Sequence, residues 1–343
     1  GIACFVNKID FTVLREEPMS STATSNQGPG LQIRDNLAND YSDIYTPEVL
    51  AALAHMSQYN VEQKRLMDER TKRRLSRMHD RKPIGFLPAD SVIEGTGIRV
   101  QDARDGNFVG AVIPHDLQRQ WLQGTGPAAK PNSPVKANLR NVAYALLSGA
   151  DGWMFDGEDA LGQITTMSLD NQRSLKLAIA RDPQFLEVAE AVSAEMNAWA
   201  RDFFGHEIIA DWRKQLDFTT KIFRARGLHL DDRHIRLDGE SFSASITDMT
   251  LYVVNNYKVL QAAGSSIVLY LPKIQTAEEA GYWNRLLTTL ESYLGLDEGT
   301  IKVYVLVEQL EQTFQLMEIR AALGLHFVGF NTGRWDYINS VSD

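Results

Sequence analysis

The segment that most constrains the fold of this chain lies between residues 300 and 336. Residues 300–307 are almost entirely apolar and β-branched, with Lys302 as their only charge. This composition predicts a strand that is buried on both faces. Apolar residues then recur at helical spacing up to Gly324, and residues 325–330 form a second apolar stretch. The segment therefore predicts a strand, a helix and a parallel strand, which is one βαβ crossover.

A carboxylate stands just beyond each of these two strands. Glu308 follows the first strand, and Asp336 follows the second after a short Asn-Thr-Gly-Arg-Trp stretch. In parallel α/β proteins the carboxyl ends of the strands form the edge that carries the active site. Two carboxylates at this edge indicate a Mg²⁺ site.

Further strands and helices alternate in the preceding part of the chain. Charged residues follow the strands, as in a barrel whose site is built from several strand ends, and no G-x-G-x-x-G motif favours an open dinucleotide-binding sheet. We therefore predict a TIM (β/α)8 barrel of which about five βα units are present. The predicted strands are residues 152–155, 220–223, 266–271, 300–307 and 325–330, and the main helices between them are 169–180, 183–204, 247–263, 277–294 and 309–324.

The chain divides into three regions by composition. Residues 1–44 contain a Ser/Thr/Asn/Gly-rich run and are expected to form a disordered leader. Residues 45–147 are expected to form an N-terminal helical and accessory region, in which residues 123–134 are a loop. Residues 148–343 are expected to form the incomplete barrel domain that carries the metal site.

Composition excludes several classes of function. The net charge is −9 over 343 residues, which argues against nucleic acid as a partner, since a basic face is normally required. No apolar run approaches the roughly 18 residues that a membrane span needs. The only cysteine, Cys4, rules out an intramolecular disulfide and suits a reducing compartment, so a cytoplasmic location is expected.

Two further groups at the predicted strand ends each allow two interpretations. Asp156, Glu158 and Asp159 are typical of an Asx turn or a helix cap, or else they contribute to metal binding. Arg224 and Arg226 alternate about Ala225, so in a strand both would point to one face. Either of them forms a plain ion pair with the acidic group or serves as a donor to an anion or enolate.

Five short motifs resemble, in order and spacing, those of the malate synthases of the shorter form with a Gly-Arg-Trp-Asp-Tyr signature. The likeness covers roughly residues 45–340. The motifs are Arg226-Gly-Leu-His229, Leu269-Tyr-Leu-Pro-Lys273, Gly299-Thr-Ile-Lys302, Val305-Leu-Val-Glu308 and Gly333-Arg-Trp-Asp-Tyr337.

The resemblance implies a (β/α)8 barrel that condenses glyoxylate with acetyl-CoA and hydrolyses the product to malate and CoA, a reaction of the glyoxylate cycle. It implies Mg²⁺ as the cofactor, with Glu308 and Asp336 as its ligands. Asp156, Glu158 and Asp159 would support the metal site.

The resemblance also assigns roles to the substrate-binding residues. Backbone amides around Gly333, Arg334, Trp335 and Asp336 would hold glyoxylate next to the metal ligands. Arg226 would be the catalytic residue that contacts the substrate and stabilises the enolate oxygen.

The family's general base belongs to a region that follows the fifth strand and is absent from this sequence. We therefore expect weak or no turnover from the chain, and self-association through an uncovered strand edge. Two alternatives are a non-catalytic protein that binds Mg²⁺ and a 2-oxo acid, and an enzyme similar to malyl-CoA or citryl-CoA lyases.

Overall fold

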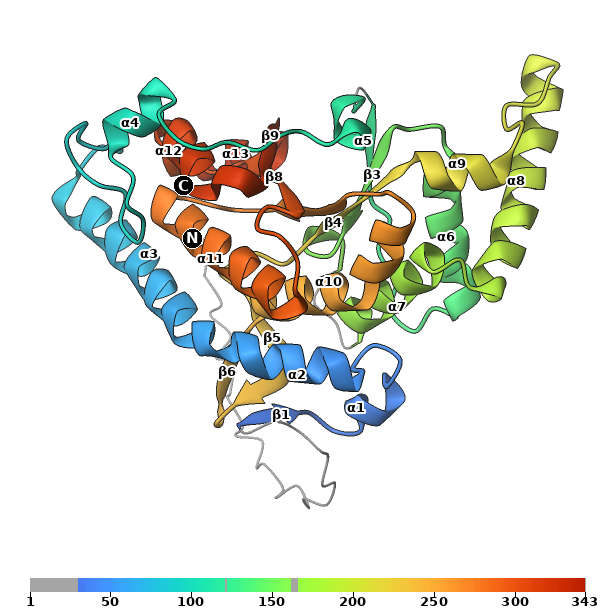
Figure 1. Cartoon of the computed structure of the whole chain (residues 1–343), viewed down its shortest axis with the longest axis horizontal. Coiled ribbons are helices and arrows are strands. Elements are labelled where there is room, and N and C mark those ends of the chain that lie inside the picture. The colour runs from blue at the N-terminus through green and yellow to red at the C-terminus, as the bar shows by residue number, and fades with distance from the viewer. Residues whose placement is uncertain (1–29, 121, 162–165, 343) are drawn as a thin grey trace, which may run out of the picture.

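A parallel sheet of six strands forms the centre of the part of the chain that the computed structural model describes, residues 30–120, 122–161 and 166–342 (Figure 1). The order of the strands in the sheet follows their order in the chain, as in a barrel built from successive βα units. The strands, in this order, are β2 (Gln123–Thr125), β3 (Gly152–Asp156), β4 (Thr220–Arg224), β7 (Ile267–Leu271), β8 (Ile301–Val307) and β9 (Phe327–Thr332).

Helices connect these strands and cover one face of the sheet. The helix α10 packs against α7, α11 and β7, and α11 packs against α12, so that the helices form a continuous layer. The helix α8 packs along α6 and projects beyond the layer at the right of Figure 1. These helices are α6 (Val135–Leu147), α7 (Met167–Ile179), α8 (Pro183–Phe204), α9 (Trp212–Phe218), α10 (Ala244–Ala262), α11 (Ala277–Leu294), α12 (Leu316–Leu323) and α13 (Arg334–Ser342).

The N-terminal part of the described chain packs on the outside of this layer. A small antiparallel sheet pairs β5 with both β1 and β6, and α2 packs against α10 and α11. This part comprises β1 (Leu31–Ile33), α1 (Leu37–Asp40), α2 (Pro47–Met56), α3 (Asn60–Asp80) and α4 (Val100–Asp105), with a 3₁₀ turn at Ser57–Tyr59, and the later strands β5 (Asp231–Leu237) and β6 (Glu240–Ser243) pack with it. The short α5 (His115–Gln118) instead places Leu117 against the face of the sheet opposite the helix layer. Further 3₁₀ turns at Asp159–Leu161, Glu311–Phe314 and Gly324–His326 lie in the connections of the central strands.

The strand sequences divide the core into two sides. The side chains of Phe155, Phe223 and Leu269 pack under the helices, with Trp283 fully buried among them. The alternate residues of the same strands form a second, smaller cluster on the opposite face, which includes Ile222 and Tyr270. This alternation fits the predicted burial of the strands on both faces.

The predicted partial barrel is confirmed, and all five predicted strands are present with small shifts of their ends. The sequence did not predict β2, because it lies in the supposed loop 123–134 and has three residues without an apolar side chain. Its place is set by pairing with β3, where the ring of Trp153 lies so close to Gly124 that a Cβ atom would meet it at 2.2 Å.

The structure also revises two of the predicted region boundaries. Residues 1–29 of the predicted leader lie outside the described residues. Residues 30–44 pack against the rest of the described chain: β1 pairs with β5, and Ile44 is fully buried, so an end of the leader at residue 44 is wrong. The central sheet begins with β2, which lies before the boundary predicted at residue 148.

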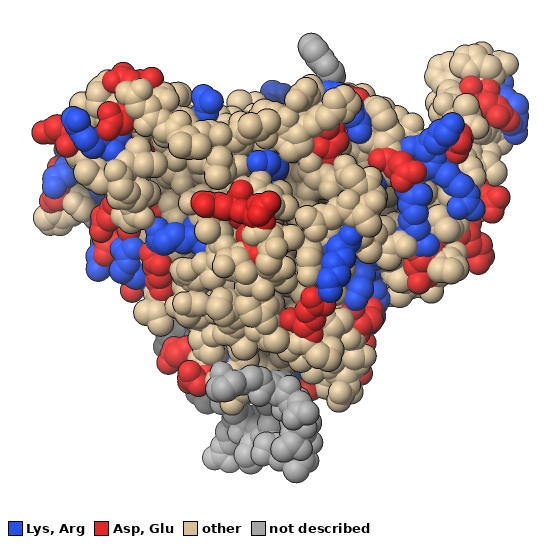
Figure 2. All heavy atoms as spheres, viewed as in Figure 1, with Lys and Arg blue, Asp and Glu red and all other residues tan. Residues whose placement is uncertain are grey.

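The surface and the helices give two further observations. Figure 2 shows acidic and basic side chains interspersed over the face in view. None of the helices in the described part of the chain is both long enough and apolar enough to cross a membrane.

Lys221, the second residue of β4, generates a prediction about stability. Burial, together with the charges of Arg181 and Arg119, lowers the pKa of its amine from 10.5 to about 7. Between these two pH values the unfolded chain binds more protons than the folded chain, so the free energy of unfolding rises with pH. We expect Lys221→Met to remove this rise and to be more stable than the parent chain below about pH 7.

The measurement is urea-induced unfolding of both chains as a function of pH. Parallel stability profiles for the parent and the variant would show that the buried amine does not titrate in this window.

Candidate metal and substrate site

The carboxyl ends of the central strands bring acidic and basic side chains together. Glu308 directly follows β8, and Asp156 is the last residue of β3. Asp159 begins the short turn after β3, and Asp336 lies in the first turn of α13, just after β9. The predicted convergence of Asp156, Asp159, Glu308 and Asp336 from separate strands is therefore present in the structure.

Three of these residues are arranged as ligands of a cation. Asp159, Glu308 and Asp336 each offer a carboxylate oxygen, and the three oxygens lie within 4.8 Å of one another. Glu308 is fully buried, whereas the side chains of Asp159 and Asp336 are 46% and 34% exposed. Oxygen ligands of this kind, on a site partly open to substrate and water, suit Mg²⁺.

Glu308 has one oxygen fixed by the protein and one oxygen without a donor. Its Oε1 accepts a hydrogen bond from the backbone N–H of Lys273 (2.6 Å). Its Oε2 is buried with no hydrogen-bond partner among the described residues. Burial, and next the neighbouring Asp336, raise the pKa of Glu308 to about 8. A buried carboxylate oxygen without a donor is what a metal ion would satisfy, so these residues fit Mg²⁺.

Two cations offset part of the negative charge. Arg224, the last residue of β4, pairs through Nη2 with Asp159 (2.8 Å), and its Nη1 lies 3.5 Å from Asp156. The Lys273 ammonium donates to Glu158 (2.7 Å) and to Asp159 (3.1 Å). Five carboxylates, counting Glu308 and Asp336, face these two cations. The remaining negative charge favours a bound divalent cation.

The acidic turn after β3 combines the two roles considered from the sequence. The Asp156 carboxylate accepts the backbone N–H of Glu158 (2.8 Å), which is the hydrogen bond of an Asx turn. The Glu158 carboxylate in turn accepts the backbone N–H of Gly227 (3.1 Å) and the ammonium of Lys273. Burial raises the pKa of Glu158. These contacts hold Asp159 at the mouth of the site.

Gly157 allows this turn to approach β4. A Cβ atom at this position would lie 2.4 Å from the carbonyl oxygen of Arg224, a contact that no larger residue can make. The Gly157 N–H donates to that same carbonyl (3.0 Å). The turn and the last residue of β4 are thereby locked together.

The structure does not bring Arg226 to this site. Its guanidinium is buried and donates to Asp248 (2.9 and 2.8 Å) and Asp232 (2.5 Å). Regular strand geometry ends at Arg224, so the alternation that predicted one face for both arginines does not extend to Arg226. Arg224 instead lies two residues after Ile222, on the face of the sheet opposite the helices. It is the arginine that contacts the carboxylates.

The predicted glyoxylate-binding stretch forms the start of α13. The N–H of Gly333 donates to the Val307 carbonyl (2.8 Å), which ties this start to the end of β8. The Arg334 guanidinium lies over the Trp335 ring, and Trp335 is 71% exposed. The N–H groups in the first turn of a helix have no intrahelical acceptor, so this end of α13 presents donors beside Asp336.

Lys273 belongs to the site, although the sequence pattern gave little indication of such a role. In the sequence it is only the last residue of one of the five motifs, yet its side chain is 16% exposed within the carboxylate group. The one sequence signal is its position just after a buried strand, at the edge where the acidic residues gather. Its left-handed backbone, with φ of 51°, directs its N–H to Glu308 and could not be read from the sequence.

A basic pocket opens beside the carboxylates. It has a volume of about 730 Å³ and is lined by Asp336, Gln309 and several residues of α3 and the segment after it. Among these are Arg70, Arg74, Arg77 and Lys82. The pocket thus has a carboxylate of the candidate cation site, Asp336, in one part of its lining and several basic side chains in another.

The fold and the site together define a TIM-barrel-type α/β protein with a candidate divalent-cation site at the carboxyl ends of its strands. Residues 220–342 match the family model described as "Malate synthase, TIM barrel domain". We therefore assign the chain as similar to part of a malate synthase.

Similar proteins support this assignment along most of the chain. The malate synthase of Myxococcus xanthus (strain DK1622) is 30% identical over 313 residues, which are 91% of this chain and 51% of that protein. Malate synthase A of Escherichia coli (strain K12) is 32% identical over 75% of this chain and 42% of that protein. The bifunctional glyoxylate cycle protein of Caenorhabditis elegans is 35% identical over 69% of this chain and 22% of that protein. The chain thus spans about half the length, or less, of these relatives.

The buried ion pairs of Arg226 generate a prediction. Arg226→Met leaves Asp232 and Asp248 buried without their cation, and the loss of one partner of such a group costs about 3–5 kcal/mol of stability. The measurement is the free energy of unfolding in urea. The exposed Arg213 on α9 provides the control, because Arg213→Met should change stability by no more than about 0.5 kcal/mol. An Arg226→Met chain as stable as the parent would show that Arg226 is not a structural residue.

Proposed function

We propose that this chain provides the Mg²⁺- and glyoxylate-binding part of a malate synthase, which condenses glyoxylate with acetyl-CoA and hydrolyses the product to malate and CoA. One observation carries the proposal: Asp159, Glu308 and Asp336 converge beside the donor end of α13. Two of these ligands lie in the sequence blocks that resemble the family most closely.

Glu308, Asp336 and Asp159 would hold the Mg²⁺ ion. Glu308 Oε2 is the strongest support for this role, because it is buried without a donor among the described residues. Asp156, Glu158 and Lys273 would position the ligands, since their hydrogen bonds fix Asp159 and Glu308. Bound Mg²⁺ would polarise the aldehyde of glyoxylate and make its carbon a better electrophile.

The first turn of α13 would orient glyoxylate. Backbone N–H groups of Arg334, Trp335 and Asp336 suit the carboxylate of a 2-oxo acid, because they combine unpaired donors with the positive end of a helix dipole. Gly333 lets this turn lie against Glu308, since a Cβ atom there would meet the Cβ of Glu308 at 2.9 Å. The substrate carboxylate and the metal ligands would therefore share one short stretch of chain.

Arg224, rather than Arg226, would stabilise the enolate oxygen of acetyl-CoA. Its side chain is 6% exposed and held by Asp159, and its Nε is buried without a hydrogen-bond partner in the described part of the chain. A fixed guanidinium with an unused N–H is suited to an oxyanion that develops during proton removal. Contacts of this kind typically contribute about 3 kcal/mol to the transition state.

The basic pocket would take the CoA part of the thioester. Its volume of about 730 Å³ and its opening beside Asp336 suit a long ligand that ends at the metal site. The basic residues of α3 that line it would contact the phosphate groups.

Isothermal titration calorimetry tests the binding part of the proposal. We expect glyoxylate to bind only when Mg²⁺ is present. Glu308→Gln should lower the affinity for Mg²⁺ by more than roughly 10–100-fold, which is the loss typical of mutating a residue that only hydrogen-bonds to a metal ligand. Glu298→Gln is the matched control, because this exposed glutamate precedes the other end of β8. Equal Mg²⁺ affinity in both variants would contradict the assignment of Glu308.

Release of free CoA tests the catalytic part. We expect a release, however slow, that requires acetyl-CoA and glyoxylate together and that falls about 10²–10³-fold in Arg224→Met. Thioester cleavage of malyl-CoA or citryl-CoA without net hydrolysis would point instead to a lyase. Binding of glyoxylate with Mg²⁺ but with no CoA release at all would favour a non-catalytic 2-oxo-acid-binding protein.

A further inference from the structure

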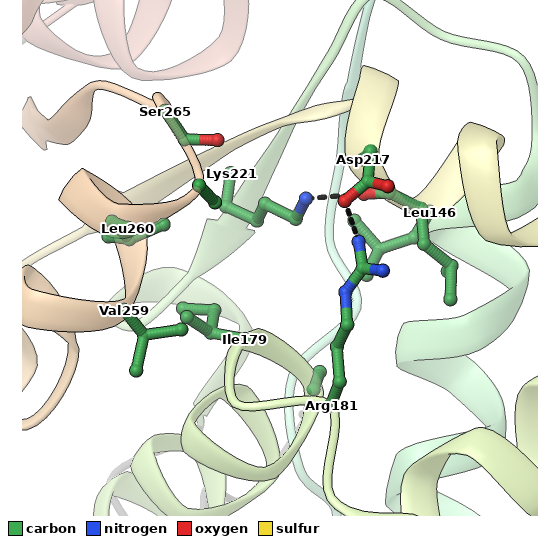
Figure 3. A pocket seen from close by; sticks show the side chains of 11 residues that line it. Leu146, Ile179, Arg181, Asp217, Lys221, Val259, Leu260 and Ser265 are labelled. Atoms are coloured by element: carbon green, nitrogen blue, oxygen red, sulfur yellow. Dashed lines mark hydrogen bonds and ion pairs between the residues drawn. The ribbon is translucent and has the colours of Figure 1, made fainter.

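A small cavity lies at the opposite end of the sheet from the carboxylates (Figure 3). Its volume is about 30 Å³, and its walls are mostly apolar, with Leu146, Ile179, Val259 and Leu260 among them. Such a cavity has room for one small molecule and no room for a hydrated ion. Lys221, near the amino end of β4, extends into it, whereas Arg224 at the other end of the same strand serves the metal site.

The amine of Lys221 is buried without a counter-ion. The residue is 9% exposed, and its Nζ donates one hydrogen bond to the carbonyl of Leu216. No carboxylate within the described residues forms an ion pair with it, and the nearby Asp217 is paired with Arg181 instead. Figure 3 shows Lys221 and Arg181 approaching the same end of α9 from two sides. Among the described residues the amine therefore has positive neighbours and no carboxylate paired with it.

This environment favours the neutral, nucleophilic form of the amine. Burial, and next the charges of Arg181 and Arg119, lower the pKa of Lys221 to about 7, so much of it is unprotonated near neutral pH. A desolvated lysine beside another cation is a recognised form of activated nucleophile. The hydrogen bond to Leu216 uses an N–H group and leaves the nitrogen lone pair available.

The cavity selects for the kind of molecule that could react with this amine. Its volume of about 30 Å³ excludes phosphate and larger ligands, and its mostly apolar walls favour the entry of an uncharged molecule. A small, linear, uncharged electrophile fits both the volume of the cavity and its mostly apolar walls. Carbon dioxide is such a molecule.

We propose that Lys221 is a site of reversible carbamylation by carbon dioxide. The nitrogen lone pair attacks the carbon of CO₂ and forms an N–C bond, and one C=O electron pair moves to its oxygen. A proton then leaves the nitrogen for solvent, so that R–NH₂ and CO₂ give R–NH–CO₂⁻ and H⁺. No oxidation or reduction is involved.

The same cations that oppose the ammonium would stabilise this product. The carbamate is an anion, and Arg181 lies at the rim of the cavity with its side chain 33% exposed. Carbamylation would replace repulsion between Lys221 and Arg181 by attraction. Arg181, which pairs with Asp217, would then also face the carbamate.

Carbon-13 NMR of the chain in labelled bicarbonate tests the proposal. We expect a carbamate carbonyl resonance besides that of the amino terminus, absent from Lys221→Met and weaker in Arg181→Met. Lys302→Met is the matched control, because Lys302 also lies near the start of a buried strand and donates to a backbone carbonyl. That variant should keep the resonance.

A second measurement locates the group without a variant. Alkylation of the carbamate to a stable ester, followed by peptide mapping of the parent chain, should place the added mass on the peptide that contains Lys221. The absence of any such ester, or a resonance that persists unchanged in Lys221→Met, would overturn the proposal.

Discussion

The mutual repulsion of carboxylates at one end of a parallel sheet is the constraint on which the rest of this structure depends. The βα connections bring Asp156, Asp159, Glu308 and Asp336 to a common edge, where burial and the neighbouring Asp336 raise the pKa of Glu308. Arg224 and Lys273 offset part of that cost but leave an excess of negative charge. A bound divalent cation would neutralise this remaining negative charge and would therefore stabilise the site.

The cations also fix the geometry of the carboxylates. Lys273 holds Glu308 through its backbone N–H and Glu158 through its ammonium, so it couples the ends of β8 and β3. Its own carbonyl accepts a hydrogen bond from Arg70 on α3 (2.6 Å), and Arg70 also pairs with the buried Glu279. The N-terminal helices thus support the site although they contribute no candidate metal ligand.

Local sequence patterns were sufficient for the parallel strands, for most helices and for the convergence of Glu308 with Asp336. They failed where tertiary contacts decide the outcome. The strand β2 is too short and too polar to show a strand pattern, and it forms because β3 offers it an edge. Arg224 and Arg226, at the end of β4 and just beyond it, are equivalent in the sequence. Only the end of the strand at Arg224 and the buried Asp248 separate their roles. The role of Lys273 depends on a backbone conformation that no residue pattern specifies.

Asp159, Glu308 and Asp336 are proposed to form one metal site together. Anomalous diffraction from crystals grown with Mn²⁺, which prefers the same oxygen ligands as Mg²⁺, tests it most directly. We expect one strong peak within coordination distance of all three carboxylates, and displacement of the Lys273 ammonium is compatible with that result. A peak at other residues, or none at these three under saturating Mn²⁺, would contradict it.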